Sequence, residues 1–267
     1  MSSAAAAAPP LSQRVAIVTG GSGGMGPVIG VALARRGVGT VVFAQRGDAS
    51  AAVSAVVAAG GAALSLPLDI SSRAGVAAFF ASFAASPAGG RLDYLVNVAG
   101  AAPRTAVEDV GEEEMAATLA VNVVGPFWMC QAARPLMFAS GGGAVVSVGS
   151  LAGEDGAFAA SPAYSIAKAG LRGMMMHLAK AGFPPHAAGA DRSALPLIRV
   201  NNVSPGPVAT AMLASMAPAD LAKITAATLT HRVTAVDEVA AAVVFFLLDA
   251  HNCTGQTMQI NGGVVRT

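Results

Sequence analysis

Two residues of scarce types in this chain, Tyr164 and Lys168, lie four positions apart. Of the 267 residues only 2 are tyrosine, and the only lysines besides Lys168 are Lys180 and Lys223. On a helix, this spacing places both side chains on one face. A phenol titrates at about pH 10, so it exchanges protons at neutral pH only if a neighbouring ammonium stabilises the phenolate. We therefore expect Lys168 to lower the pKa of Tyr164 by roughly three pH units and make it an acid–base catalyst; a shared exposed helix face is the alternative.

Two polar residues elsewhere in the chain have the chemistry to assist that tyrosine. Ser150 follows an apolar run that predicts a strand, and its hydroxyl could hold a substrate carbonyl oxygen beside Tyr164. Asn122 is an amide in an otherwise apolar helical segment, where a buried amide needs hydrogen-bond partners. A capping serine and a helix-packing asparagine are the structural alternatives.

A glycine-rich turn near the N-terminus has the pattern of a phosphate-binding loop. It runs from Thr19 to Gly26, after an expected strand and before an expected helix. Glycine there permits a tight turn, lets the backbone approach a pyrophosphate and leaves helix N-terminal N–H groups facing the negative charge. A plain turn is the alternative. The residues expected to contact a cofactor here are Gly20, Ser22, Gly23, Gly24, Met25 and Gly26.

The residues after the second expected strand bear on the choice between the two nicotinamide dinucleotides. An acidic residue there would accept hydrogen bonds from a free 2′-hydroxyl and repel a 2′-phosphate. The sequence has Ala44-Gln45-Arg46-Gly47 instead, with no carboxylate and with a guanidinium that suits a phosphate. We therefore expect NADP(H), bound through Arg46; a solvated surface arginine is the alternative.

The composition excludes several classes of protein. Hydrophobic residues make up 54% and charged residues 12%, and 16 basic against 15 acidic side chains give a net charge of +1. A disordered chain would need fewer apolar residues or more net charge, and a nucleic-acid-binding protein would need clustered Lys and Arg. The longest apolar runs, such as Val239 to Leu248, are shorter than the roughly 20 residues that span a bilayer. We therefore expect a soluble protein with no nucleic-acid partner and no membrane span.

The cysteines, histidines and N-terminus narrow the class further. Cys130 and Cys253 lie far apart without a CxxC pair, and the 4 histidines are scattered, which argues against a metal site and for free thiols. The first ten residues contain no Arg or Lys and so lack the basic start of a targeting peptide. We expect a cytoplasmic protein in which residues 1–12 form a disordered tail and residues 13–267 form one domain.

From Arg14 onward, short β-branched runs alternate with longer alanine-rich segments, the pattern of βα units around a parallel sheet. The expected strands are Val15 to Thr19, Thr40 to Ala44, Ala63 to Leu66, Tyr94 to Asn97, Ala144 to Val148, Ile198 to Val203 and Thr257 to Ile260. The expected helices start near Gly24, Ala49, Ser72, Glu112, Ser161 and Ala235. These elements predict an α/β domain with a doubly wound, parallel seven-stranded sheet and helices on both faces. A long loop, Phe183 to Pro196, interrupts the pattern, and we expect it on the edge opposite the ligand crevice.

In this order, the motifs resemble those of the short-chain dehydrogenase/reductase family, over nearly the whole chain. The motifs that carry the resemblance are TGxxxGxG at 19–26, Leu68-Asp69-Ile70, Asn97-Val98-Ala99-Gly100, Asn122, Gly149-Ser150, YxxxK at 164–168, Arg199-Val200-Asn201, Ser204-Pro205-Gly206 and the segment Thr254 to Gly263. The resemblance implies a Rossmann-type single domain with the catalytic residues Asn122, Ser150, Tyr164 and Lys168. The cofactor contacts that it implies are Asp69, Ile70, Asn97, Ala99, Gly100, Tyr164, Lys168, Pro205, Gly206, Val208 and Thr210.

The resemblance also implies a mechanism. Tyr164 would donate a proton to a carbonyl oxygen while hydride arrives from the nicotinamide. Ser150 would position that oxygen, and Lys168 would lower the tyrosine pKa and hold the ribose. Asn122 would anchor a water that relays protons to Lys168.

Three features depart from the family pattern without touching the catalytic residues. Val98 stands where the family usually has a second asparagine, which removes a polar contact of the central strand. Asn202 is an extra amide at a position that is usually small or apolar. The insertion at 183–196 lengthens the connection after the helix that normally packs in a subunit interface, so it bears on the oligomeric state. We expect a homo-oligomer and leave dimer or tetramer open.

The expected substrate is a small carbonyl compound or the corresponding alcohol. The predicted pocket walls are mostly small and apolar, which suits a hydrophobic ketone or aldehyde; they include Ala101, Leu151, Phe158, Met212 and Met216. Glu154 and Asp155 would disfavour an anionic substrate at the mouth, with a solvated loop as the alternative.

The sequence therefore predicts an NADP(H)-dependent carbonyl reductase or secondary alcohol dehydrogenase. The alternatives are a reductase of 3-oxoacyl thioesters of acyl-carrier protein or CoA, and a catalytically inactive cofactor-binding protein. The uncharged segment Leu136 to Ala144 offers no basic surface for an acidic carrier protein, which weakens the thioester alternative.

Overall fold

A computed structural model describes residues 9–156, 160–182, 191, 195–210, 213 and 218–264. Within them, seven parallel strands form one sheet in the order β3-β2-β1-β4-β5-β6-β7. The strands are β1 (Val15–Thr19), β2 (Thr40–Gln45), β3 (Ala62–Pro67), β4 (Tyr94–Asn97), β5 (Gly143–Val148), β6 (Ile198–Pro205) and β7 (Thr257–Ile260). The strand order reverses at β1, which pairs with β2 on one side and β4 on the other, as in a doubly wound fold. The predicted fold class is confirmed.

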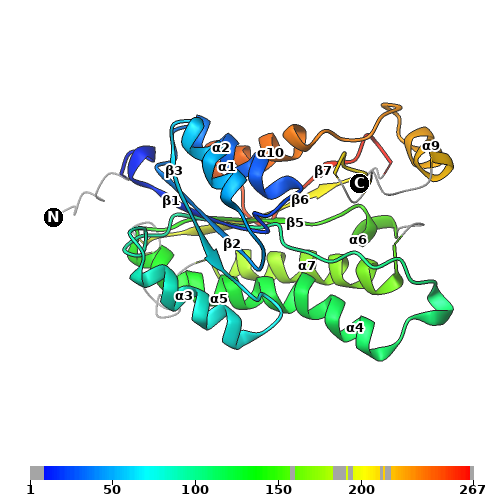
Figure 1. Cartoon of the computed structure of the whole chain (residues 1–267), viewed down its shortest axis with the longest axis horizontal. Helices are drawn as coiled ribbons and strands as arrows, with labels where there is room; N and C mark the ends of the chain where they lie inside the picture. The colour runs from blue at the N-terminus through cyan, green and yellow to red at the C-terminus, as the bar shows by residue number, and fades with distance from the viewer. Residues whose placement is uncertain are drawn as a thin grey trace.

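Helices cover both faces of this sheet (Figure 1). One layer consists of α1 (Met25–Arg35), α2 (Ser50–Ala58) and α10 (Val236–Val244), and the other of α3 (Arg73–Ala85), α5 (Gly125–Ala139) and α7 (Pro162–Lys180). Successive strand residues contribute to two separate apolar cores, so that Val18 packs in the first layer and Ile17 in the second. Because both faces are covered, every residue of β1, β4 and β6 is buried, and β1 reads as a continuous apolar or β-branched run.

The structure adds elements that the sequence pattern did not predict. The helix expected from Glu112 is α4 (Glu112–Leu119), which continues through the π-helical turn η3 (Ala120–Val124) into α5. Short helices α6 (Ala152–Asp155) and α9 (Pro218–Ala227) flank the carboxyl ends of the strands (right in Figure 1). The remaining turns are η1 (Leu11–Gln13), η2 (Val107–Asp109) and η5 (Phe245–Asp249).

The continuous helix Glu112–Ala139 is the one helix among the described residues that is long and apolar enough to cross a membrane. It begins with three glutamates, and its α5 portion packs beside α3 and against β4 and β5. That is the position of a covering helix in an α/β sandwich, and core helices of soluble proteins have the same length and composition.

The predicted insertion, Phe183 to Pro196, falls mostly outside the described residues, but the structure places the residues beside it. The carbonyl of Gly182 accepts a hydrogen bond from Ile198 N (2.9 Å), and that of Leu197 accepts one from Gly143 N (3.0 Å). Both contacts lie at the starts of β5 and β6. The residues on either side of the insertion, Gly182 and Leu197, therefore lie at the edge that the sequence predicted.

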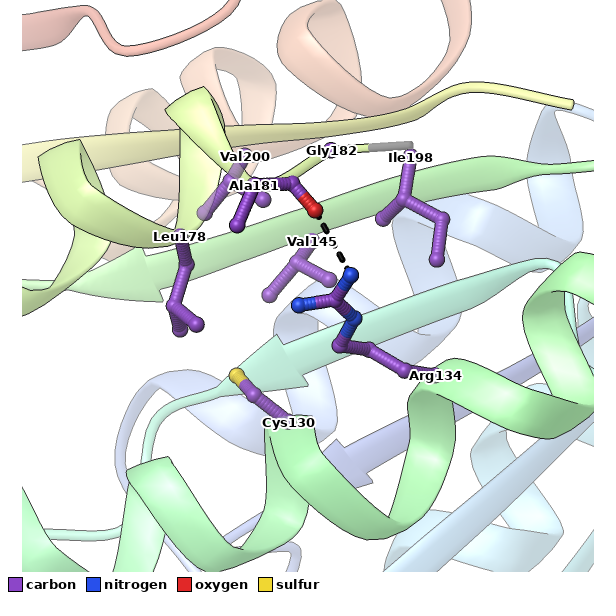
Figure 2. A pocket seen from close by; sticks show the side chains of 8 residues that line it. All are labelled: Cys130, Arg134, Val145, Leu178, Ala181, Gly182, Ile198 and Val200. Atoms are coloured by element: carbon purple, nitrogen blue, oxygen red, sulfur yellow. Dashed lines mark hydrogen bonds between the residues drawn. The ribbon is translucent and has the colours of Figure 1, made fainter. Parts of the chain in front are cut away.

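A small cavity of about 10 Å³ lies at this same edge (Figure 2). Arg134 Nη2 donates to the carbonyl of Ala181 across it (2.6 Å), and the thiol of Cys130, one turn earlier on α5, also lines it. Burial raises the pKa of Cys130 to about 12, so this thiol is unreactive at neutral pH. The cavity has room for about one water molecule.

Candidate functional site

A cleft of about 1690 Å³ opens at the carboxyl ends of the strands. Its walls come from the turns that follow β1 to β6, from the start of α7 and from α9. The predicted site residues that line it are Gly20, Ser22, Gly23, Gly24, Met25, Arg46, Asp69, Ile70, Ala99, Gly100, Ala101, Ser150, Leu151, Tyr164, Lys168, Pro205, Gly206, Val208 and Thr210. The predicted wall residues Phe158, Met212 and Met216 lie outside the described residues.

The turn between β1 and α1 presents the N-terminus of a helix to the cleft. Gly24 directly precedes α1 and has a φ of 62°, in the left-handed region that disfavours other residues. A Cβ at Gly26 would lie 2.2 Å from the carbonyl oxygen of Gly20, so the turn closes only around glycine. Gly23 is exposed, and a Cβ there would meet no atom within 4 Å. The open cradle and the free helix end fit a dinucleotide pyrophosphate.

The ends of β2 and β3 place a guanidinium and a carboxylate on the same wall. Arg46 is exposed directly after β2. Asp69 accepts hydrogen bonds from the hydroxyl (2.6 Å) and the N–H (3.1 Å) of Ser71, which lower its pKa, and the positive charge of Arg46 lowers that pKa further. Arg46 therefore lies within electrostatic reach of Asp69, at the strand end where the sequence placed it.

Asn122 fixes the backbone that follows β4. Its Nδ2 donates to the carbonyls of Ala101 and Thr118 (2.9 Å each), and its Oδ1 accepts from Ala101 N (3.3 Å). A Cβ at Gly100 would lie 2.8 Å from that oxygen. Asn122 belongs to the π-helical turn η3, and such turns occur frequently at functional sites.

Ser150 and Tyr164 meet in the cleft, where their side chains are hydrogen-bonded. Ser150 lies two residues after β5, and its Oγ accepts from Ala152 N (3.1 Å). Tyr164 lies in the first turn of α7. The predicted pairing of this serine with this tyrosine is present in the structure.

Lys168 lies one turn further along α7, beneath the tyrosine ring. Its Nζ is 5.6 Å from the centre of the Tyr164 ring and donates to the carbonyl of Val148 (2.9 Å). Burial lowers the pKa of Lys168 from 10.5 to about 8. The side chain is therefore still mainly an ammonium at neutral pH, and it is fixed to the end of β5.

The predicted lowering of the Tyr164 pKa is wrong for this structure. Burial of the phenol raises its pKa above the ordinary value of 10, and the hydrogen bond with Ser150 offsets only part of that effect. The spacing of Tyr164 and Lys168 predicted their shared face correctly, but the ammonium faces the ring and the backbone carbonyl of Val148. Loss of hydration is therefore the largest influence on the pKa of Tyr164.

Asn97 does not line the cleft, although it was predicted to contact the cofactor. It is buried in the sheet, where its Nδ2 donates to Ser147 Oγ on β5 (3.1 Å). The end of β4 is instead fixed by Thr19 Oγ1, which accepts from the N–H groups of Val98 (3.0 Å) and Ala99 (3.1 Å). Val98 therefore does not leave this strand end without a polar contact.

The residues after Ser150 are ordered differently from the expected solvated loop. Glu154 lies in α6, its side chain is only 4% exposed, and it forms an ion pair with Arg172 of α7. The solvated-loop alternative is therefore wrong for Glu154, because a partner 18 positions away neutralises it. Asp155 does line the cleft.

Several residues at the site were missed by the sequence reasoning. Gln45 is buried under the Arg46 turn, where its Nε2 donates to the carbonyl of Gly47 (3.1 Å). Helix α9 adds Asp220 and Lys223 to the cleft, and its first residue, a proline, followed by an acidic first turn was a usable helix signal. Among the described residues, no three His, Cys, Asp or Glu side chains are grouped so as to hold a metal ion.

The cleft thus joins a helix N-terminus suited to a pyrophosphate with a proton-donating phenol. The phenol is hydrogen-bonded to a hydroxyl and lies over a buried ammonium. This arrangement can hold an oxygen atom of a substrate and exchange a proton with it next to a bound nucleotide.

Comparison with known proteins agrees with that chemistry. A family model described as enoyl-(acyl carrier protein) reductase matches residues 20–265. An uncharacterized oxidoreductase of Methylorubrum extorquens is 35% identical over 260 residues, covering 95% of this chain and 98% of the relative. Carbonyl reductase family member 4 of Xenopus tropicalis is 32% identical over 251 residues, covering 94% and 98%. A crystal structure of a 3-oxoacyl (acyl-carrier-protein) reductase from Agrobacterium tumefaciens with NADP bound has a TM-score of 0.81 at 26% identity, covering 95% of each chain.

Proposed function

The chain belongs to the short-chain dehydrogenase/reductase family of oxidoreductases, and from this we propose that it reduces a ketone or aldehyde with NADPH, or oxidises the corresponding alcohol with NADP. The observation that carries the proposal is the hydrogen-bonded pair of Ser150 and Tyr164, which lies over Lys168 in the same cleft as the glycine turn.

The proposed mechanism assigns the proton to Tyr164. The nicotinamide, when bound, supplies or accepts the hydride. Because burial raises its pKa, Tyr164 is protonated at neutral pH and can donate its proton to a carbonyl oxygen that Ser150 holds. The ammonium of Lys168 lies over the ring and would stabilise the phenolate that remains, and Asn122 keeps the facing backbone in place.

The preference for NADP(H) rests on Arg46. It is exposed on the cleft wall at the end of β2, and no carboxylate stands at positions 45–47. A guanidinium there would pair with a 2′-phosphate in a forked geometry. The structural neighbour from Agrobacterium tumefaciens, which has NADP bound, supports the same choice.

A 3-oxoacyl thioester reductase is the second candidate function. Arg104 and Lys223 both line the cleft, and such cations suit the phosphates of a CoA or phosphopantetheine arm. The same NADP-bound neighbour is a 3-oxoacyl (acyl-carrier-protein) reductase. An apolar ketone or aldehyde remains the first candidate because the described walls at Ala101 and Leu151 are small and apolar.

We also propose that the chain works in the cytoplasm as a homo-oligomer, a dimer or a tetramer. Large apolar side chains are exposed on adjoining helices, at Val124 in η3 and at Ile166 and Met176 in α7. Burial of such side chains against a second copy would be favourable. Light scattering on the purified chain tests the oligomer, and a monomer at micromolar concentration would contradict it.

A turnover assay tests the activity. The protein is mixed with NADPH and a panel of apolar ketones, aldehydes and acetoacetyl-CoA, and nicotinamide absorbance is followed. We expect turnover by the wild type and a loss of about 10²- to 10⁴-fold for Tyr164→Phe, which removes the proton donor. Absence of turnover on every ketone, aldehyde and thioester would favour the inactive cofactor-binding protein. Equal turnover by the Phe variant would overturn the mechanism.

A further inference from the structure

Glu114, the third residue of α4, connects two segments that the proposed mechanism does not connect. One carboxylate oxygen accepts a hydrogen bond from Ser161 Oγ (2.5 Å), and the other accepts one from the hydroxyl of Thr105. Glu114 is half-buried, whereas its neighbours Glu112 and Glu113 are exposed. We name Glu114, Thr105 and Ser161 together the Glu114 clasp.

The Ser161 end of the clasp holds the first turn of the catalytic helix. Ser161 is fully buried at the N-cap of α7, where its Oγ accepts from Ala163 N (3.3 Å) and its carbonyl accepts from Tyr164 N (2.9 Å). Because the Ser161 hydroxyl proton is donated to Glu114, the hydroxyl oxygen is oriented to accept from the helix. A negative charge at this helix end also interacts favourably with the helix dipole.

The Thr105 end of the clasp holds one wall of the cleft. Thr105 belongs to the cleft-lining segment 104–107, which is irregular until η2 begins. The N–H of Ser161 also donates to the carbonyl of Pro103 (2.8 Å), so the same segment is attached to α7 twice. These contacts between segments, rather than a helix or strand, determine how far this wall lies from α7.

The charge of Glu114 allows it to hold both segments at once. Hydrogen bonds from Ser161 first and Thr105 second lower the pKa of the carboxyl, so it is ionised at neutral pH. An ionised carboxylate presents two acceptor oxygens, whereas a glutamine presents one. Charge-assisted hydrogen bonds are also stronger than neutral ones.

We propose that Glu114 is a positioning residue that sets the distance between the substrate-side wall at 103–107 and the proton donor Tyr164. The inference rests on the proposed carbonyl reduction. Both partners of Glu114 lie on segments 103–107 and 160–164, which include neither the glycine turn nor Arg46. Removal of the Glu114 side chain should therefore weaken carbonyl turnover much more than cofactor binding.

The test compares Glu114→Ala with Glu113→Ala, which removes the same charge from the same helical turn at an exposed position. For Glu114→Ala we expect kcat/KM for the carbonyl substrate to fall about 10- to 100-fold, because a misplaced wall lowers the fraction of productive complexes. The Kd of NADPH, measured by fluorescence titration, should change by a much smaller factor. Glu114→Gln, with one acceptor oxygen, should be intermediate, and Glu113→Ala should match the wild type in both quantities.

Hydrogen exchange supplies a readout that does not depend on turnover. We expect faster exchange at 103–107 and 160–164 in Glu114→Ala, and no change there in Glu113→Ala. The proposal is wrong if hydrogen exchange at these segments is unchanged in Glu114→Ala, or if Glu114→Ala and Glu113→Ala change it equally. If the wild type shows no turnover and the variants still show the expected exchange pattern, the proposed activity is wrong but the contacts of the Glu114 clasp are supported. A loss of NADPH affinity as large as the loss of kcat/KM would show that Glu114 acts on the whole fold and not on the wall.

Discussion

The cofactor half of the cleft, formed by the turns at 20–26, 45–47 and 68–70, is shaped by the backbone, whereas the carbonyl half, formed by 100–107, 150–155 and 160–164, is shaped by side chains. In the first half, a tight glycine turn leaves no room for a Cβ at Gly26. In the second, Asn122 connects a helix with the loop after β4, and Glu114 and the pair of Glu154 with Arg172 connect segments of different helices. The two halves should therefore respond differently to substitution.

The difference suggests how one fold can serve many substrates. A dinucleotide needs the same close approach of backbone atoms in every case, and only a few residue types satisfy it. A wall held by hydrogen bonds between side chains can move when one partner changes, while the sheet and the cofactor half keep their shape. Each prediction below asks whether a substitution affects one half and spares the other.

The largest effect is expected in the cofactor half, for Gly26→Ala. The added Cβ would lie 2.2 Å from the carbonyl oxygen of Gly20, which is backbone and cannot rotate away. We expect a loss of about 3 kcal/mol or more in the free energy of unfolding together with loss of NADPH binding. Urea unfolding and fluorescence titration measure the two quantities. Gly23→Ala is the matched control for the free energy of unfolding, because a Cβ there meets nothing within 4 Å. Wild-type stability of Gly26→Ala would show that the turn tolerates a side chain at this position.

The next effect concerns Lys168, where the two halves meet. Lys168→Met should lower kcat by about 10²- to 10⁴-fold, because the phenolate loses the ammonium that stabilises it.

The same variant tests the burial of the charge. The folded pKa of about 8 lies below the ordinary 10.5, so between these values the unfolded chain binds more protons and the stability of the wild type rises with pH.

Relative to Lys168→Met, the wild type should therefore gain about 3 kcal/mol in the free energy of unfolding between pH 8 and pH 10.5. Lys180 and Lys223 are present in both the wild type and the variant, so their contributions to the pH dependence cancel in this difference. Denaturant unfolding across that pH range measures it. A difference that does not change with pH would mean that Lys168 titrates normally and is not desolvated.

A smaller effect, again confined to the cofactor half, is expected for Arg46→Ala. Loss of a charged hydrogen bond should reduce the preference for NADPH over NADH about 10- to 100-fold. The KM of the carbonyl substrate should not change, since Arg46 follows β2 and belongs to the cofactor half of the cleft. Arg35→Ala removes the same charge from an exposed position at the end of α1 and is the control. An unchanged preference in Arg46→Ala would show that another residue contacts the 2′-phosphate.

What could be predicted from the sequence follows the same division. The strand bounds, the glycine turn and Arg46 depend on neighbours within a few residues, and the structure has them where local patterns placed them. The pKa of Tyr164 was predicted in the wrong direction because spacing along a helix reports distance and not loss of hydration. Nothing in the run of three glutamates distinguishes Glu114 from its neighbours, since its partners lie 9 and 47 positions away.

The smallest effect is expected where the carbonyl half has a glycine packed against a buried side chain, between Gly149 and Asn202. A Cβ at Gly149 would lie 2.7 Å from the Nδ2 of Asn202, a buried amide with no hydrogen-bond partner in the described part of the chain. Gly149 precedes Ser150 and donates its N–H to the carbonyl of Val203 (2.7 Å). The amide on β6 thus occupies the space that a side chain at 149 would need.

Gly149→Ser should therefore cost about 1 to 3 kcal/mol in the free energy of unfolding and lower kcat by displacing Ser150. Asn202→Ala alone should change stability little, because the lost packing is offset by removal of an unpaired buried amide. The double variant should recover most of the stability and turnover that Gly149→Ser loses. Urea unfolding and kcat of all four proteins complete the cycle. If the losses of the two single variants simply add in the double variant, the side chains at 149 and 202 do not compete for one space. The position of Ser150 would then depend on polar contacts, as we propose for the wall at 103–107.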